Sequence, residues 1–171
     1  MPDVAILDPK MTKTLPPRIT ASTGMDTLCH AIEAFSCLQK NPLSDAYAAQ
    51  AIELVRDYLL KAVCHGYSKE ARLAMANASF LAGAAFSNSM VGVVHAVGHA
   101  LGGVCHVAHG DAIDDPSARR VCFSTGRSAK KEYAKLLLYL AGPEIYVKTP
   151  EEKRQTARYM RCLRFGTGCT G

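Results

Sequence analysis

The segment from Val91 to Leu101 constrains the fold more than any other, because every residue in it is small or apolar except His95 and His99. A helix of this composition has no polar face to present to water, so we expect it to lie at the centre of a helix bundle. Each buried histidine needs a polar partner, and a backbone carbonyl, a substrate or a metal ion can provide one. The segment therefore predicts both a buried core and a candidate site.

The spacing of apolar residues predicts further helices along the 171-residue chain. Apolar side chains recur every three or four residues from Ser44 to Val63, and alanines dominate the stretch that begins at Ser68. Helices are also expected over residues 25–36 and 128–140. The predicted fold class is therefore all-α, a helical bundle with at most one short N-terminal strand.

A carboxylate and several imidazoles gather in two regions of the sequence. Asp26 and His30 are four residues apart on one predicted helix, so their side chains share a face. His95 and His99 form a second pair with the same spacing, and His109 follows in the next loop. Carboxylate oxygen and imidazole nitrogen suit Fe²⁺ or Zn²⁺, and no Cys-x2-Cys pair offers a competing thiolate site.

The same residues also have ordinary structural interpretations. Asp26 would lie in the first turn of its helix, where the helix dipole favours a negative charge, and His30 would lie on the helix surface. Spacing alone favours His95 and His99 as the metal-binding pair, because side chains at i and i+4 converge. It does not decide among the four histidines of this region, which are His95, His99, His106 and His109.

The distribution of charge argues against a nucleic-acid partner. Lys and Arg number 20 against 15 Asp and Glu, and the whole excess follows residue 110. These basic residues are not interleaved with aromatic side chains, and no known nucleic-acid module is present. No apolar run reaches the length of about 20 residues that spans a membrane, and the N-terminus shows no signal-peptide pattern. We expect no nucleic-acid partner, no membrane partner and a cytoplasmic location.

Several segments match the motifs of one family in order and spacing. Residues 23–35 read Thr-Gly-Met-Asp-Thr-Leu-Cys-His-Ala-Ile-Glu-Ala-Phe, which resembles the TGMDALxHAIEAY motif of the iron-containing, or group III, alcohol dehydrogenases. Residues 82–88 resemble the AGxAFxNA segment of that family, and residues 92–110 resemble its GxxHAxxHxLGxxxxxxHG motif. Residues 2–9 resemble the strand that enters its helical domain, so the resemblance covers residues 2–112.

This resemblance implies a metal site and a reaction. The implied ligands are Asp26, His30, His95 and His109, which would hold Fe²⁺ or Zn²⁺. His99 would lie beside the nicotinamide of NAD or NADP and the substrate, as a proton relay or a support for the ligands. The implied reaction is NAD(P)-linked oxidation of a primary alcohol or small diol to its aldehyde, with the metal acting as a Lewis acid. A small alcohol or aldehyde is the expected substrate.

The chain departs from the family in two ways, of which the first concerns its domains. The resemblance begins near the junction of the family's two domains, so we expect the N-terminal nucleotide-binding domain to be absent and the isolated chain to be inactive. A second copy of the chain or a separate nucleotide-binding domain is then a candidate partner. We divide the chain into an entry strand and Pro-rich linker, 1–20, in which Pro16 and Pro17 cannot be helical, and a helical metal-binding domain, 21–171.

The second departure lies in residues 113–127, which are polar, basic and aperiodic where the family has an apolar helix. Residues 132–140 are family-like again, and residues 158–171 are atypical once more. We hypothesise that the coding frame slipped locally, recovered and slipped again. A divergent loop is the alternative.

Two other functions fit the same residues. One is a zinc-dependent enzyme resembling glycerol dehydrogenase, whose site typically lacks one of the four ligands. The other is a non-catalytic helical fragment, metal-holding or merely structural, that docks on a partner through its apolar helix. The choice between iron and zinc is open at this point, because these ligands accept both metals. The choice between NAD and NADP is open as well.

Overall fold

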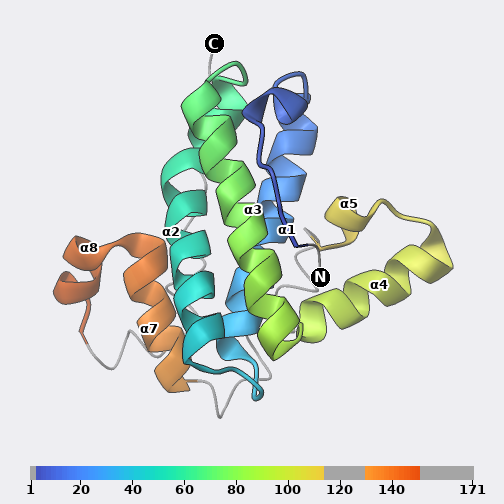
Figure 1. Cartoon of the computed structure of the whole chain (residues 1–171). Coiled ribbons are helices and arrows are strands. Elements are labelled where there is room, and N and C mark those ends of the chain that lie inside the picture. The colour runs from blue at the N-terminus through green and yellow to red at the C-terminus, as the bar shows by residue number, and fades with distance from the viewer. Residues whose placement is uncertain (1–2, 114–129, 151–171) are drawn as a thin grey trace.

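The computed structural model of the chain describes residues 3–113 and 130–150, and this part of the chain is all-α, without a strand. The long helices α1, α2 and α3 form a bundle, and two pairs of shorter helices flank it on opposite sides (Figure 1). The predicted fold class is confirmed. The helical elements are η1 Pro9–Thr12, α1 Pro17–Ser36, α2 Pro42–Cys64, α3 Lys69–Ser89, α4 Val93–Cys105, α5 His109–Ile113, α7 Lys130–Ala141 and α8 Pro143–Lys148.

Polar caps set where two helices of the bundle begin. The side chain of Asn41 accepts hydrogen bonds from the backbone N–H groups of Leu43 and Ser44, and Ser44 Oγ accepts one from the N–H of Asn41. This reciprocal pair is a capping box, and it starts α2. Ser68 caps α3 by accepting a hydrogen bond from the N–H of Ala71 at 3.2 Å, at the start that the sequence predicted.

The prediction that the Pro-rich linker cannot be helical is wrong at its last proline. Pro17 is the first residue of α1, and residues 18–20 are helical with it, while Pro16 stays extended with φ −58° and ψ 152°. Proline is favoured at this position, because the first N–H groups of a helix have no partner and the ring presets a helical φ. As a result, Asp26 lies in the middle of a 20-residue helix rather than in its first turn.

Small residues let the helices of the bundle approach closely. At Gly24 on α1, an added Cβ would overlap Leu59 of α2 and lie 3.2 Å from Met75 of α3. This contact fixes the part of α1 that leads into Asp26. The alanine-rich pattern of α3 was expected in a bundle of this kind, and it is confirmed by the burial of Ala71, Ala74, Ala78, Ala82 and Ala85.

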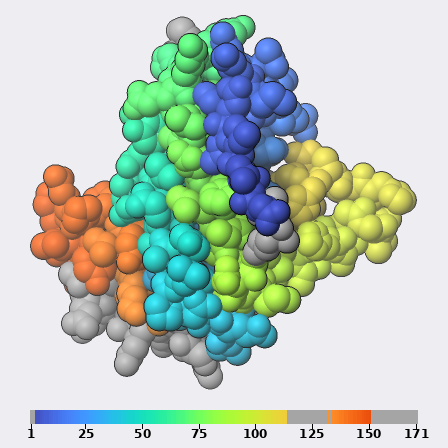
Figure 2. Space-filling model, in the orientation of Figure 1, coloured from blue at the N-terminus to red at the C-terminus, as the bar shows by residue number. Residues whose placement is uncertain are grey.

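The prediction that residues 91–101 form a central helix is wrong. α4 buries only Val94, His95 and Gly98, and it projects from the bundle beside α5 (Figure 2). Val104 on this helix is 80% exposed, and no element of the described ranges covers that face. Among the described helices, none alone is long and apolar enough to cross a membrane. α3 and α4 together have the length and composition of a membrane-spanning segment, but the pair is bent by 101°. Composition predicted the helix, but only the packing on α1 and α5 determines which face is buried.

The two atypical segments cannot be compared with the structure. Residues 114–127 and 158–171 lie outside the described residues, so the hypothesis of a frame change in them stays a prediction. The second segment contains a Gly-x-Gly-x-x-Gly spacing at residues 166–171. That spacing indicates nucleotide binding only when it follows a strand and opens a helix.

Candidate metal centre

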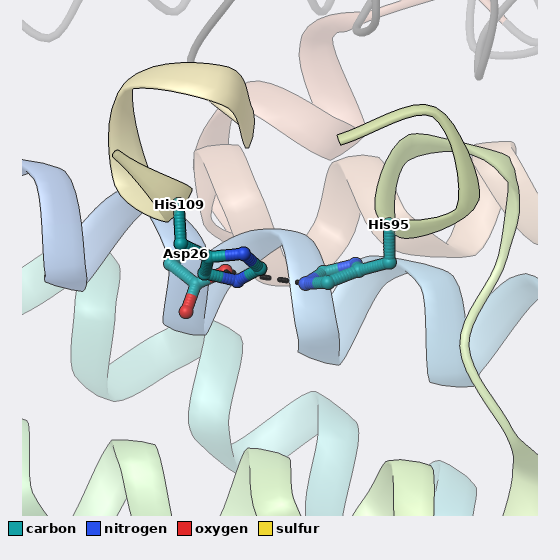
Figure 3. Close-up of side chains that lie close together, drawn as sticks. All are labelled: Asp26, His95 and His109. Carbon is teal, nitrogen blue, oxygen red and sulfur yellow. Dashed lines mark hydrogen bonds and ion pairs between the residues drawn. The ribbon is translucent and has the colours of Figure 1, made fainter. Parts of the chain in front are cut away.

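Asp26, His95 and His109 each bring one donor atom to a common point. These three atoms lie within 4.8 Å of one another, and the side chains come from α1, α4 and α5 (Figure 3). Oδ1 of Asp26 is 3.2 Å from Nε2 of His95 and 3.4 Å from Nε2 of His109. The structure therefore brings together three of the four side chains that the resemblance implies as ligands.

The surrounding imidazoles hold the pKa of Asp26 below its usual value. Its place in the middle of α1 removes the stabilisation by the helix N-terminus that the sequence suggested. Burial raises the pKa of Asp26, but the hydrogen bond with His95 and the electrostatic interactions with the neighbouring imidazoles of His30, His109 and His95 outweigh burial, so the pKa lies below its usual value. Asp26 therefore presents a carboxylate to the site at neutral pH.

His30 lies beside this group of three. Its ring stacks between His95, with ring centroids 4.0 Å apart, and Phe86, with centroids 4.6 Å apart. Its Nδ1 is 3.7 Å from Oδ2 of Asp26. Burial lowers the pKa of His30 to about 4; the Asp26 carboxylate opposes this shift, and charge on His95 and His109 adds to it. His30 is therefore neutral at neutral pH, with a ring nitrogen available beside the carboxylate.

The pairing that spacing favoured, His95 with His99, is not the one that meets Asp26. His99 is exposed on α4, with its ring centroid 5.2 Å from that of His109 and 5.9 Å from that of His95. His109 was expected in a loop but is the first residue of the short helix α5, which places its Nε2 against Asp26. His106 is exposed at the C-terminus of α4 in the left-handed conformation, with φ 54°.

His95 is the most deeply buried member of the group, with its side chain 1% exposed. Its Nδ1 is 2.6 Å from Oε2 of Glu33, and its Nε2 is 3.2 Å from Oδ1 of Asp26. Burial lowers the pKa of His95, but the hydrogen bonds to Asp26 and Glu33 outweigh burial and raise the pKa to about 9. The surroundings of Nε2 therefore stabilise positive charge, whether a proton or a metal ion carries it.

Glu33 is a residue of this site that the sequence patterns did not single out. Its side chain is 1% exposed and lies against His95 and the start of α4. Burial raises the pKa of Glu33, but the hydrogen bonds from His95 and from two backbone N–H groups outweigh burial and lower the pKa. Glu33 follows Asp26 by seven residues and His30 by three, so all three share one face of α1. That spacing is the signal that could have identified it.

These donor atoms suit a divalent metal. One carboxylate and two or three imidazoles form a donor set that both Fe²⁺ and Zn²⁺ accept. The side chain of His109 is 46% exposed, so one side of the group is open to a small molecule. On the buried side, one hydrogen bond with Glu33 holds the ring of His95. The residues present therefore fit a metal ion with an accessible coordination position.

Comparison with known proteins identifies a family and several relatives of this chain. Residues 20–164 match the Fe-containing alcohol dehydrogenase family, C-terminal. Long-chain-alcohol dehydrogenase 1 of Geobacillus thermodenitrificans (strain NG80-2) is 51% identical over 110 residues, which are 64% of this chain and 28% of that protein. The NAD-dependent methanol dehydrogenase of Bacillus methanolicus is 48% identical over 109 residues, which are 64% of this chain and 29% of that protein.

A solved structure agrees with these matches. The crystal structure of 1,3-propanediol oxidoreductase aligns with a TM-score of 0.79 and 35% identity, over 94% of this chain and 42% of that one. The chain thus spans less than half the length of each of these relatives. The similarity includes the helices that carry the metal-binding candidates.

Proposed function

Since this chain belongs to the iron-containing alcohol dehydrogenase family, we propose that it forms the metal-binding part of an NAD(P)-linked alcohol dehydrogenase. The observation that carries the proposal is the meeting of Asp26, His95 and His109, whose donor atoms lie within 4.8 Å of one another. His30, beside the same carboxylate, completes a ligand set of four. The names of two relatives, a long-chain-alcohol and a methanol dehydrogenase, support a primary alcohol or its aldehyde as substrate.

Each ligand residue makes its own contribution to the site. Asp26 supplies negative charge, because its low pKa keeps it ionised. His30 offers an uncharged nitrogen, because its pKa of about 4 leaves it neutral. The exposed flank of His109 leaves an approach for the substrate. When bound, the metal supplies Lewis acidity that polarises the C–O group of the alcohol or aldehyde.

His99 is the residue that we assign to proton movement beside the substrate. It is exposed, and its ring centroid lies 5.2 Å from that of His109, on the open flank of the group. His99 is not one of the three residues whose donor atoms meet, but its ring lies beside those of His95 and His109. A nicotinamide ring bound on the same flank would contact His99, and the NAD dependence named for one relative supports such a cofactor.

The group of three donor atoms favours zinc as a second candidate metal. Catalytic zinc sites commonly use three protein ligands and keep the fourth position for water or substrate. Asp26, His95 and His109 form such a group without His30. A zinc-dependent enzyme resembling glycerol dehydrogenase is therefore the alternative to the iron enzyme.

Partner and location belong to the same proposal. The candidate partners that we propose are a second copy of the chain and a nucleotide-binding domain, and a cytoplasmic location would supply NAD(P). The apolar face of α4 supports a protein partner, because Val104 on it is 80% exposed.

Metal binding to the purified, metal-free chain tests the proposed function. Anaerobic titrations with Fe²⁺ and Zn²⁺ would be followed by calorimetry and by thermal melting. We expect a single ion to bind and the melting midpoint to rise, with a gain of about 2.7 kcal/mol when free metal is about 100 times Kd. An unchanged midpoint with both ions would contradict the proposal. Binding of NAD(P)H to the metal-loaded chain, followed by fluorescence, would in addition support part of an enzyme over a protein that only holds metal.

A further inference from the structure

Glu33 places its carboxylate between the ring of His95 and the first turn of α4. Oε1 accepts a hydrogen bond from the N–H of Val94 at 2.6 Å, and Oε2 accepts one from the N–H of Gly92 at 3.0 Å. Oε2 also lies 2.6 Å from Nδ1 of His95. α4 has no side-chain cap of its own, because Gly92 occupies the capping position. Glu33, from α1, therefore caps α4 and holds the ring with one carboxylate.

Only an ionised carboxylate satisfies these partners. Both oxygens of Glu33 face N–H donors, and a carboxylate accepts on both sides. A glutamine of the same shape would turn its NH₂ group toward Val94 on one side, or toward Gly92 and His95 on the other. At least one buried donor would then lose its acceptor. The arrangement also requires Nδ1 of His95 to carry a hydrogen.

Gly92 provides the room that Glu33 needs. A Cβ at this position would lie 2.8 Å from Oε1 and 3.0 Å from Cδ of Glu33. The backbone of Gly92 is extended, with φ −111°, so other residues can adopt it. Space beside Glu33, rather than backbone conformation, therefore explains the glycine.

We propose that Glu33 is a positioning residue, which fixes the ring of His95 so that Nδ1–H points to Glu33 and Nε2 points to Asp26. The effect on metal binding rests on the proposed function, whereas the effect on the ring does not. With Nδ1–H bound to Glu33, Nε2 is the nitrogen left for a metal, 3.2 Å from Oδ1 of Asp26. A hydrogen bond to a carboxylate also makes the imidazole a stronger donor to metals.

The first experiment observes the ring in the metal-free chain. In ¹H–¹⁵N spectra of the histidine side chains, the Nδ1 proton of His95 should appear far downfield and exchange slowly, because its hydrogen bond is short and buried. The variant His95→Gln assigns the resonance by removing it. In Glu33→Gln the resonance should move upfield and exchange faster. A folded Glu33→Gln protein with an unchanged resonance would overturn the proposal.

The second experiment uses Co²⁺ as the probe, because its visible absorption bands report ligand geometry. Glu33→Gln should weaken Co²⁺ binding by about 10–100-fold and change the bands. Gly92→Ala keeps the carboxylate but displaces it, so it should weaken binding and change the bands in the same direction. If Glu33→Gln does not fold, Gly92→Ala carries both experiments. Unaltered affinity and bands in the folded variants would contradict the proposed role.

Two control variants separate positioning from a general loss of stability. In Gly103→Ala, on the same helix, the new Cβ meets nothing within 4 Å. Ser68→Ala removes the cap at the start of α3, which is the end of that helix remote from α4. Both should bind Co²⁺ as the unaltered chain does. If the unaltered chain binds no Co²⁺, the proposed function fails. The resonance of the Nδ1 proton of His95 in the metal-free chain still tests whether Glu33 positions the ring.

Discussion

The rings of His30 on α1 and His95 on α4 stack, with centroids 4.0 Å apart and planes inclined by 24°. Each ring turns a nitrogen toward the same carboxylate. Nε2 of His95 is 3.2 Å from Oδ1 of Asp26, and Nδ1 of His30 is 3.7 Å from Oδ2. Two imidazoles that approach one carboxylate side by side are placed to bind the same ion, and this relationship is why we propose His30 as the fourth ligand.

Replacing His30 tests whether the site uses four ligands or three. We expect His30→Ala to weaken Fe²⁺ and Zn²⁺ binding by at least about tenfold, or about 1.4 kcal/mol, because one metal–nitrogen bond is lost. Calorimetric titration measures the effect. His65→Ala, at the exposed C-terminus of α2, is the control and should bind normally. Normal binding by His30→Ala would instead favour the three-ligand zinc site.

The raised pKa of His95 predicts how the stability of the metal-free chain depends on pH. The pKa is 6.5 in the unfolded chain and about 9 in the folded one. The folded protein therefore keeps a proton that the unfolded chain loses as the pH rises through this interval. The resulting stabilisation is fully present below pH 6.5 and disappears as the pH passes 9. We expect the free energy of unfolding to fall by up to about 3 kcal/mol across this range.

Urea unfolding at a series of pH values measures this dependence. His95→Gln should remove most of the decline between pH 6.5 and 9, because the variant has no titrating imidazole there. Saturating Zn²⁺ should reverse the trend, since the metal binds only the deprotonated ring. If the stability of His95→Gln falls with rising pH as steeply as that of the unaltered chain, a group other than His95 causes the pH dependence.

The close contact at Gly24 predicts that adding a single methyl group there destabilises the fold. In Gly24→Ala the new Cβ would overlap Leu59, which is buried, and would press on Met75. We expect a loss of about 1–3 kcal/mol in the free energy of unfolding, because the bundle has no room for the extra volume. Gly83→Ala is the matched control, since its Cβ meets nothing within 4 Å, and it should stabilise α3 by about 0.5–1 kcal/mol. Equal effects of the two substitutions would contradict the close approach of α1 and α2.

Turnover by this chain alone should be slight. The residues that match the family belong to its C-terminal part. We expect the chain loaded with Fe²⁺ to oxidise small primary alcohols only weakly, because turnover requires an oriented hydride acceptor and the resemblance assigns nucleotide binding to the other domain of the family. A steady-state assay with NAD and NADP measures this. Robust turnover would refute the expectation and show that this chain holds the cofactor itself.

Much of the fold follows from local sequence signals. The apolar spacing and the cap at Ser68 predicted α2 and α3, since helix formation depends on neighbours in the chain. Burial of α4 could not be predicted in the same way. Its composition indicated a central helix, yet the buried face is decided by contacts with α1 and α5, which are distant in the sequence.

The site shows the same division between local and long-range information. The spacing of Asp26 and His30 placed them on one face of a helix, as observed. Spacing could not select His109 over His99, because that choice depends on how α5 folds back onto α1. Glu33 escaped notice because its partners, the start of α4 and the ring of His95, belong to a different segment.

The metal content of the chain tests the central claim most directly. The chain and two variants, His95→Ala and His106→Ala, would be purified anaerobically and assayed by elemental analysis. Since His95 is the most deeply buried residue of the group and His106 is exposed outside it, we predict one iron or zinc ion per molecule in the chain and in His106→Ala, and almost none in His95→Ala. Equal metal content in all three proteins, or no metal in the unaltered chain, would contradict the account.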